Sequence, residues 1–187
     1  MTAAEGQQLR RLSTDDLSRD DAAEVRALMD EAFGDGEDAF EDGDWLNAIG
    51  GMHFLLTVDG RLVSHASVVR RTLHLPGVAL PTGYVEAVAT LPTEQGKGYG
   101  TAVMRAAAEH IEGGAFELGA LGTGEFGFYE RLGWRRWRGP SGVLRGDGRR
   151  EPTPADDGYV MVLGLPHTPA LDWDAPITCE ERAGSPW

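Results

Sequence analysis

The sequence predicts an α+β fold in which helices flank a mixed central β-sheet. Three observations support this prediction. Residues 14–33 have the apolar spacing of an amphipathic helix, and residues 52–75 have the pattern of a β-hairpin. After residue 84, strand patterns and helix patterns alternate, which is typical of a sheet that contains parallel as well as antiparallel neighbours.

The first element is predicted to be a helix from Thr14 to Phe33. Ser13 and Thr14 are candidate N-caps, and acidic residues follow in the first turn. Val25, Leu28 and Met29 then recur at helical spacing. We therefore expect one face of this helix to be buried.

An acidic segment follows, with eight Asp or Glu residues between positions 30 and 44 and neither Lys nor Arg among them. Its glycines favour a loop, and Trp45 is expected to begin a short helical turn. For most of these acids the simplest interpretation is a solvated run. The members are Asp30, Glu31, Asp35, Glu37, Asp38, Glu41, Asp42 and Asp44.

Eight further elements are predicted from apolar runs and turn residues. Strands are expected at Met52–Val58 and Leu62–Leu75 around the Asp59-Gly60 turn, at Tyr84–Leu91, at Phe116–Leu121, at Trp134–Trp137 and at Tyr159–Leu165, and helices at Gly98–Ile111 and Phe126–Leu132. Residues 146–157 are expected to be a loop. The tail from Pro166 to Trp187 has no clear period.

Composition limits the classes of protein to consider. The chain has 187 residues, 41% of them hydrophobic, which predicts a single domain over 1–187 with its core at about 8–165 and a tail over 166–187. Its net charge of −13 opposes binding to nucleic acid or to an anionic membrane, and favours a polycationic small molecule. One cysteine, no secretory signal and no membrane-length apolar run favour a cytoplasmic protein.

The segment from Tyr84 to Thr101 is the most informative part of the sequence. A strand ends there, and a glycine-rich turn with Gly96, Gly98 and Gly100 begins a helix. Backbone N–H groups at such a turn, together with the positive end of a helix dipole, suit a pyrophosphate. No Gly-Lys-Ser/Thr ends the turn and no third Rossmann glycine follows, so neither of those phosphate motifs is present. The alternative is an ordinary start of a helix.

The spacing Gln95-x-x-Gly98-x-Gly100 after an apolar strand resembles the acetyl-CoA signature of the GCN5-related N-acetyltransferases (GNAT). Further matches resemble the aminoglycoside 2′-N-acetyltransferases of that superfamily. They include Asp44-Trp45, Gly50-Gly51-Met52-His53, Gly83-Tyr84-Val85-Glu86, Asp156-Asp157-Gly158, Arg182-Ala183-Gly184 and the final Trp187. This resemblance implies the GNAT fold, with a V-shaped splay in the mixed sheet, and a tail that folds back to the substrate cleft.

The resemblance also implies how acetyl-CoA is held. Pantetheine would lie along Val88, Ala89 and Thr90, with the Val88 N–H polarising the thioester carbonyl. The amides of the loop would hold the pyrophosphate, with a possible charge contact from Lys97. The loop residues are Gln95, Gly96, Lys97, Gly98, Tyr99, Gly100 and Thr101.

Two catalytic residues follow from the same resemblance. Glu86 would act as the base, through a water, on an amine that must lose a proton before it attacks. Tyr129 would act as the acid that protonates the leaving thiolate. The alternatives are an exposed or paired strand carboxylate for Glu86 and a packing tyrosine for Tyr129. The five histidines have no ligand spacing, so no metal site is expected, and His65 is interpreted as a hydrogen-bonded core histidine.

A polycationic substrate needs several acceptors around one cleft. The candidates are Asp35, Asp38, Asp44, Glu86, Ala87, Gly122, Asp156, Asp157 and the carboxylate of Trp187. Asp44 is best placed by its motif, and Asp35 and Asp38 compete for a second position. The Asp156-Asp157-Gly158 sequence could equally be a plain turn. Ser185 and the short turn at Gly122-Thr123 depart from the family pattern, which affects substrate range rather than the reaction.

Three functions remain open from the sequence. The first is 2′-N-acetylation of aminoglycosides by direct transfer from acetyl-CoA, in a homodimer by family resemblance. The second is acetylation of another polycationic amine, such as a polyamine, an amino sugar or a basic peptide. The third is a non-catalytic protein of the same fold that binds acyl-CoA or cations.

Overall fold

The structure, a computed structural model, describes residues 6–36, 39–182 and 184–187. The chain divides into two compact units. Unit 1 is formed by Met1–Val69 and Val85–Glu109, and unit 2 by Arg70–Tyr84 and His110–Trp187. Two long strands and one helix cross these boundaries along the chain, so each contributes residues to both units.

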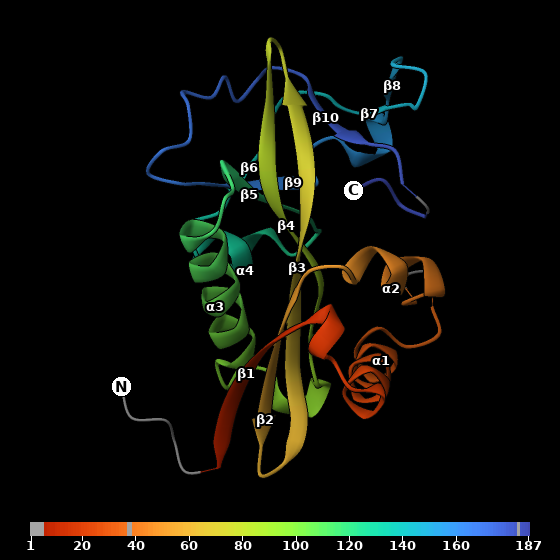
Figure 1. Ribbon diagram of the computed structural model, residues 1–187, viewed down its shortest axis with the longest axis vertical. Helices are drawn as coiled ribbons and strands as arrows, with labels where there is room; N and C mark the ends of the chain where they lie inside the picture. The colour runs from red at the N-terminus through yellow and green to blue at the C-terminus, as the bar shows by residue number, and fades with distance from the viewer. Residues whose placement is uncertain (1–5, 37–38, 183) are drawn as a thin grey trace. The chain divides into compact units, whose positions relative to one another are not determined.

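The elements in chain order are labelled in Figure 1. The strands are β1 (Gln7–Ser13), β2 (Met52–Val58), β3 (Arg61–Leu75), β4 (Val78–Thr90), β5 (Leu118–Gly122), β6 (Arg135–Arg136), β7 (Ser141–Leu144), β8 (Arg150–Pro152), β9 (Val160–Gly164) and β10 (Ile177–Glu180). The α-helices are α1 (Arg19–Phe33), α2 (Asp42–Ala48), α3 (Tyr99–Gly113) and α4 (Phe126–Glu130). Short 3-10 helices are η1 (Thr14–Asp16), η2 (Pro92–Glu94) and η3 (Pro154–Asp156).

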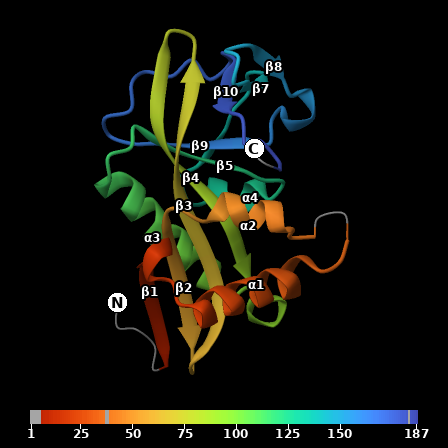
Figure 2. The same ribbon diagram turned by 45° about the vertical axis from the view of Figure 1, so that its right-hand side comes forward.

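In unit 1, antiparallel strands form a sheet with helices on both faces. β1 pairs with β2 along its whole length, and β2 pairs with β3. Helices α1 and α2 lie on one side of these strands and the unit 1 part of α3 lies on the other (Figures 1 and 2). The predicted stripe on α1 is buried, since Val25 and Met29 are fully inaccessible and Leu28 nearly so.

The start of the first helix differs from its prediction. α1 begins at Arg19, because Ser18 and Asp21 form a capping box in which each side chain accepts from the other's backbone N–H. Thr14 instead begins η1, and its hydroxyl binds the backbone of Gly50 and Gly51. Strand β1 was not predicted, because its mostly exposed and half-exposed residues lack an apolar alternation.

The predicted hairpin turn is confirmed. Asp59 has φ 50° and Gly60 has φ 82°, the left-handed pair that a tight Asp-Gly turn requires. The two strands that it joins are among the most buried of the chain.

Unit 2 contains the parallel part of the sheet. β4 pairs in parallel with β5 over Thr82–Tyr84, and β5 pairs with β9 in antiparallel fashion, as β9 does with β6. On the other side, His74 and Leu73 of β3 pair with β10, which runs parallel to β7, and β7 pairs with β8. The prediction of a mixed sheet is therefore confirmed.

Several predicted boundaries in unit 2 were wrong. The tail contains β10, and the predicted loop at 146–157 contains β8 and η3. These strands have three or four residues each, too few to show a period. The predicted strand Trp134–Trp137 is reduced to Arg135–Arg136, and β4 begins at Val78 rather than Tyr84.

Two glycines set how closely backbone and side chains pack in unit 2. A Cβ on Gly83 would lie 2.6 Å from Cγ1 of Ile111, and one on Gly119 would lie 3.1 Å from the Trp134 ring. Both glycines therefore allow the sheet to pack tightly against bulky neighbours. No helix within the described residues is long and apolar enough to cross a membrane.

Candidate active site

The glycine-rich turn of unit 1 has the geometry of an anion site. Gly96 and Gly98 have φ of 76° and 87°, which L side chains rarely adopt, and α3 begins at the next residue, Tyr99. The carbonyl of Gly98 accepts from the Ala102 N–H, the first bond of the helix. The N–H groups of a first helical turn have no acceptor within the helix and lie at its positive end, so this turn suits a pyrophosphate.

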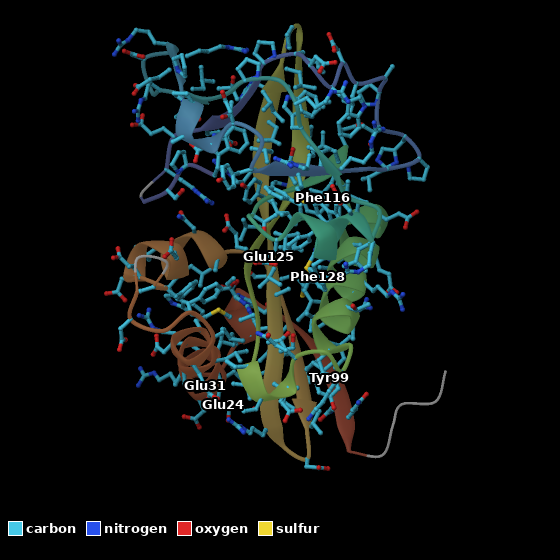
Figure 3. All side chains as sticks on the ribbon, turned by 180° about the vertical axis from the view of Figure 1, so that it is seen from behind. Glu24, Glu31, Tyr99, Phe116, Glu125 and Phe128 are labelled. Carbon is cyan, nitrogen blue, oxygen red and sulfur yellow. The ribbon has the colours of Figure 1, made fainter. Side chains whose placement is uncertain are left out.

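The Lys97 and Gln95 side chains at this turn both have partners within the chain. Lys97 is exposed, and its Nζ lies 2.9 Å from Oε2 of Glu94, so part of its charge is already neutralised. Gln95 is also exposed, and its Nε2 donates to the Thr90 carbonyl at 3.4 Å. Tyr99, labelled in Figure 3, lies in the first turn of α3 and is half-buried.

The predicted cofactor strand contains a strained residue. Ala87 has φ 48° inside β4, the left-handed region that costs a non-glycine residue about 1–3 kcal/mol. A left-handed residue within a strand changes the direction of the neighbouring peptide groups, as the first residue of a G1 bulge does, and we call the Ala87 position the bulge of β4. Val88, the predicted thioester contact, follows directly and is half-buried.

Side chains of β3 hold the carbonyls on both sides of this bulge. Ser67 Oγ donates to the Glu86 carbonyl at 3.2 Å, and Ser64 Oγ donates to the Ala89 carbonyl at 2.9 Å. Nδ1 of His65 lies 2.8 Å from the Ala87 carbonyl. These residues are buried, so water does not compete for the bonds.

His65 belongs to a buried pair. Its Nε2 lies 3.1 Å from Nδ1 of His53, and both rings are fully inaccessible to solvent. Burial lowers the pKa of His53 to about 4, and burial, only partly offset by the bond to Ala87, lowers the pKa of His65 to about 3. Both rings are therefore neutral at pH 7, and the interpretation of His65 as a bonded core histidine is confirmed.

Glu86, the predicted base, is half-buried on β4 immediately before the bulge. Ala87, Ala89 and Thr90 lie on the same strand, with Ala89 buried. The predicted base, the predicted thioester contact and the predicted pyrophosphate turn all belong to unit 1.

The carboxylates of the acidic segment differ in exposure and in partners. Asp35 is exposed, whereas Asp44 is half-buried at the start of α2 and accepts from the Glu41 N–H at 2.9 Å. Asp42 pairs with Arg26, and Glu31, labelled on α1 in Figure 3, pairs with Arg61. Asp38 lies outside the described residues.

In unit 2 the predicted acid, Tyr129, lies on α4 and is buried to 7% exposure. Its ring packs edge-on against Phe128 and Trp134, at centroid distances of 4.9 and 6.3 Å. Burial, with a smaller contribution from the charge of Glu125, raises its pKa well above its usual value. The phenol therefore keeps its proton at neutral pH, as a proton donor must. Phe128 and Glu125 are labelled in Figure 3.

Unit 2 also brings two predicted substrate residues together at its C-terminal tail. A Cβ on Gly122 would lie 3.1 Å from the backbone carbon of Trp187. The Trp187 ring is buried, and its Nε1 donates to Oγ1 of Thr153 at 3.1 Å. Arg71, also buried, holds the tail by donating to the Pro186 carbonyl at 2.7 Å.

The two aspartates before β9 have different environments. Asp157 Oδ1 accepts from both the N–H and the hydroxyl of Ser141 at 2.7 Å, which fixes this carboxylate to β7. Asp156 is half-buried, and its carbonyl accepts from the Tyr159 N–H. Asp157 therefore has a structural role in the turn whatever else it binds.

Comparison with known proteins identifies the family. The acetyltransferase (GNAT) domain model matches residues 13–137. The chain belongs to the GNAT family. An aminoglycoside 2′-N-acetyltransferase from Mycolicibacterium fortuitum is 41% identical over 181 residues, which are 95% of this chain and 91% of that protein.

Solved GNAT structures have the same fold. A GNAT family acetyltransferase from Brucella melitensis, determined in complex with acetyl-CoA, has a TM-score of 0.62 at 19% identity and covers 91% of this chain and 94% of that one. A GCN5-related N-acetyltransferase from Kribbella flavida has a TM-score of 0.57 at 20% identity, over 74% of this chain. This chain spans only about a third of that longer protein, 36% of its length.

The GNAT assignment confirms three predictions: the α+β GNAT fold, the acetyltransferase class and acetyl-CoA as the cofactor. Within the described residues, no group of three or more His, Cys, Asp or Glu side chains could hold a metal ion. The contacts around Ala87 were missed by sequence reasoning. A left-handed alanine has no signature in the sequence. His53 and His65 can be seen in the sequence, but nothing in it indicates that their rings are in contact.

Proposed function

We propose that the chain transfers the acetyl group of acetyl-CoA directly to the 2′-amine of an aminoglycoside. The observation that carries this proposal is the 41% identity to an aminoglycoside 2′-N-acetyltransferase over 95% of the chain. That span extends beyond the 13–137 match to the family model. The net charge of −13 supports a polycationic substrate.

The segment from Glu86 to Thr101 supplies most of the chemistry in this proposal. The Val88 N–H donates to the thioester carbonyl oxygen, where negative charge develops as the amine attacks. The amides between Gln95 and Thr101 hold the pyrophosphate. Val88, Ala89 and Thr90 contact the pantetheine.

Two side chains move protons. Glu86 accepts, through a water, the proton that the ammonium must lose, so that the amine lone pair can form the C–N bond. As the C–S bond breaks, Tyr129 gives its phenolic proton to the departing sulfur. The acetylated nitrogen then loses its second proton to solvent, and solvent returns a proton to the Tyr129 phenolate, so the products are an acetamide and a free thiol. The phenol of Tyr129 keeps its proton at neutral pH, so that proton is present when the sulfur departs.

Carboxylates and the tail bind the polycation in this proposal. The members are Asp35, Asp38, Asp44, Glu86, Ala87, Gly122, Asp156, Asp157 and the carboxylate of Trp187. Asp44 is favoured in the acidic segment because it is half-buried while Asp35 is exposed.

We further propose that residues 1–187 act as one GNAT domain, with 166–187 serving the substrate cleft. The family match supports this because residues 13–137 include parts of both units. We also propose that the protein is a cytoplasmic homodimer and that it binds no nucleic acid. Light scattering after size-exclusion chromatography measures the number of subunits.

The test measures thiol release from acetyl-CoA with two aminoglycosides. Tobramycin carries an amine at position 2′, and kanamycin A carries a hydroxyl there. Release with tobramycin alone is the expected result. Release with both would mean another regiospecificity, and release with neither, alongside acetyl-CoA binding, would point to a different amine.

The Glu86→Gln variant tests the base. We expect a lower rate at neutral pH with little change in acetyl-CoA affinity, and equal rates in variant and wild type would contradict the assignment. Added salt should weaken the binding of aminoglycoside more than that of acetyl-CoA, since screening acts on the attraction between acids and a polycation.

A further inference from the structure

A chain of hydrogen bonds runs through unit 1 to the bulge of β4. Thr14 Oγ1 accepts from the N–H groups of Gly50 and Gly51 at 2.8 and 3.1 Å, and it lies 2.9 Å from His53 Nε2. His53 Nδ1 lies 3.1 Å from His65 Nε2, and His65 Nδ1 lies 2.8 Å from the Ala87 carbonyl. None of these bonds belongs to the regular pairing of the sheet.

The positions of the protons follow from the last acceptor. A carbonyl oxygen only accepts, so His65 Nδ1 carries a proton. In a neutral ring the other nitrogen, Nε2, must then accept, and so His53 Nδ1 carries a proton too. His53 Nε2 is therefore an acceptor. The Thr14 hydroxyl lies 2.9 Å from this nitrogen and 3.3 Å from the Gly51 carbonyl, and it donates to the nearer acceptor, His53 Nε2. Every bond in the chain then has one donor, and all of them point toward Ala87.

Burial keeps this arrangement neutral. Both rings are inaccessible to solvent, and a proton added to His65 Nε2 would face the N–H of His53. The donors and acceptors of this chain of hydrogen bonds are therefore fixed in one direction at neutral pH.

The Ala87 carbonyl shares a planar peptide group with the Val88 N–H. In a trans peptide these two groups point in opposite directions, so a bond that fixes the carbonyl also fixes the N–H. All peptide bonds in the described residues are trans. Because Ala87 is left-handed at φ 48°, this peptide is turned away from the ordinary direction of a strand and needs a partner to hold it there.

We propose that His65, oriented by His53 and Thr14, is a positioning residue that aims the Val88 N–H at the thioester carbonyl. This inference rests on the proposed function, which gives the Val88 N–H its role. His65 itself touches neither substrate. Its effect passes through one peptide group, and His53 and Thr14 act by holding His65 in the tautomer that donates from Nδ1.

The tautomers test the chain without any activity. In protein labelled with nitrogen-15 at histidine, long-range proton–nitrogen correlation distinguishes the two tautomers of each ring. We expect both His53 and His65 to carry their proton on Nδ1, which is the less populated tautomer of free histidine. A proton on Nε2 of either ring, or a charged ring at pH 7, would overturn the proposal.

Kinetics test the positioning role. His65→Leu removes the donor, whereas the amide of His65→Asn can occupy the place of Nδ1 and still donate to Ala87. Since loss of one donor to a developing oxyanion costs about 10²–10³ in kcat, we expect misdirection in His65→Leu to lower kcat at least about tenfold. The Kd of CoA, which has no acetyl carbonyl, should stay within about twofold.

Most of the kcat should return in His65→Asn. His167→Leu is the matched control, because His167 also bonds a backbone carbonyl, that of Phe116 at 2.7 Å, but lies in unit 2 and is exposed. It should keep the wild-type kcat. A wild-type kcat in His65→Leu, or a loss of CoA affinity equal to the loss of kcat, would overturn the positioning role.

The two proposals fail in different ways. If the wild type transfers acetyl to no amine, the proposed function is overturned. The positioning role of His65 is overturned with it, even if both tautomers are as expected. If the wild type turns over and only the His65 variants behave contrary to expectation, the proposed function stands and the positioning role alone is refuted.

Discussion

Replacing the two buried histidines should change how the stability of the protein depends on pH. The unfolded chain protonates His53 and His65 near the ordinary pKa of 6.5, whereas burial lowers their folded pKa values to about 4 and about 3. Between these limits the unfolded state binds more protons than the folded state. The stability that neutral burial provides is therefore complete above pH 6.5 and decreases as the pH falls below it.

The size of the effect follows from the pKa values. At about pH 5 the unfolded rings are protonated and the folded rings are not, and each pKa unit is worth about 1.4 kcal/mol. Going from about pH 7.5 to about pH 5 should thus lower the free energy of unfolding by about 2 kcal/mol for each ring, or about 4 kcal/mol for both.

The assay is urea unfolding at both pH values, followed by tryptophan fluorescence, because Trp134 and Trp137 are buried. In the His53→Asn/His65→Asn double variant the loss between the two pH values should be smaller than in wild type by about 4 kcal/mol. Carboxylates titrate alike in the variant and in wild type, so their contribution cancels in the difference between the two proteins. His167→Asn controls for the loss of one imidazole. Equal losses in the double variant and wild type would refute the argument.

Three further substitutions have defined outcomes. Gly98→Ala places an alanine at φ 87°, which should cost about 1–2 kcal/mol of stability, measured by thermal melting. The same substitution should raise the KM for acetyl-CoA, measured from initial rates. Unchanged values of both would show that the turn tolerates a side chain. Tyr129→Phe should lower kcat about tenfold or more with little change in melting temperature, and an unaltered kcat would remove the acid role. Ser18→Ala breaks the capping box of α1 and should lower the free energy of unfolding by about 1 kcal/mol without changing kcat. Urea unfolding measures this, and a midpoint equal to that of wild type would contradict the role of the cap.

The long and strongly patterned elements of the fold could be predicted from the sequence. The hairpin around Asp59-Gly60 and the helix after Gly98 are local events, determined by turn glycines and by apolar spacing within a few residues. The same holds for the glycine-rich turn, where Gly96 and Gly98 have positive φ angles.

The short strands could not be predicted, because tertiary pairing forms them. Residues Ile177–Glu180 become a strand through pairing with β3 and β7, partners far away in the sequence. The start of α1 was predicted from Ser13 and Thr14, whereas Ser18 caps the helix because Asp21 lies three residues later and completes the capping box.

The candidate site divides in the same way. The motif predicts a role for the glycines and the residues after them, and that role stays a prediction. The left-handed Ala87 and the contacts of His65 depend instead on side chains that cross from one strand to another. An alanine has no intrinsic preference for a left-handed conformation, so nothing local in the sequence marks this position.

The burial of the single cysteine suits the protein to an assay that detects released CoA through its thiol. Cys179 is fully buried on β10, its Sγ lies 3.2 Å from the Pro186 carbonyl, and burial raises the pKa of the thiol. A folded enzyme therefore gives little background with a thiol-specific dye, so the colour that develops reports the CoA released. In urea the same thiol becomes accessible, and its labelling rate then measures how often the C-terminal strand of unit 2 opens.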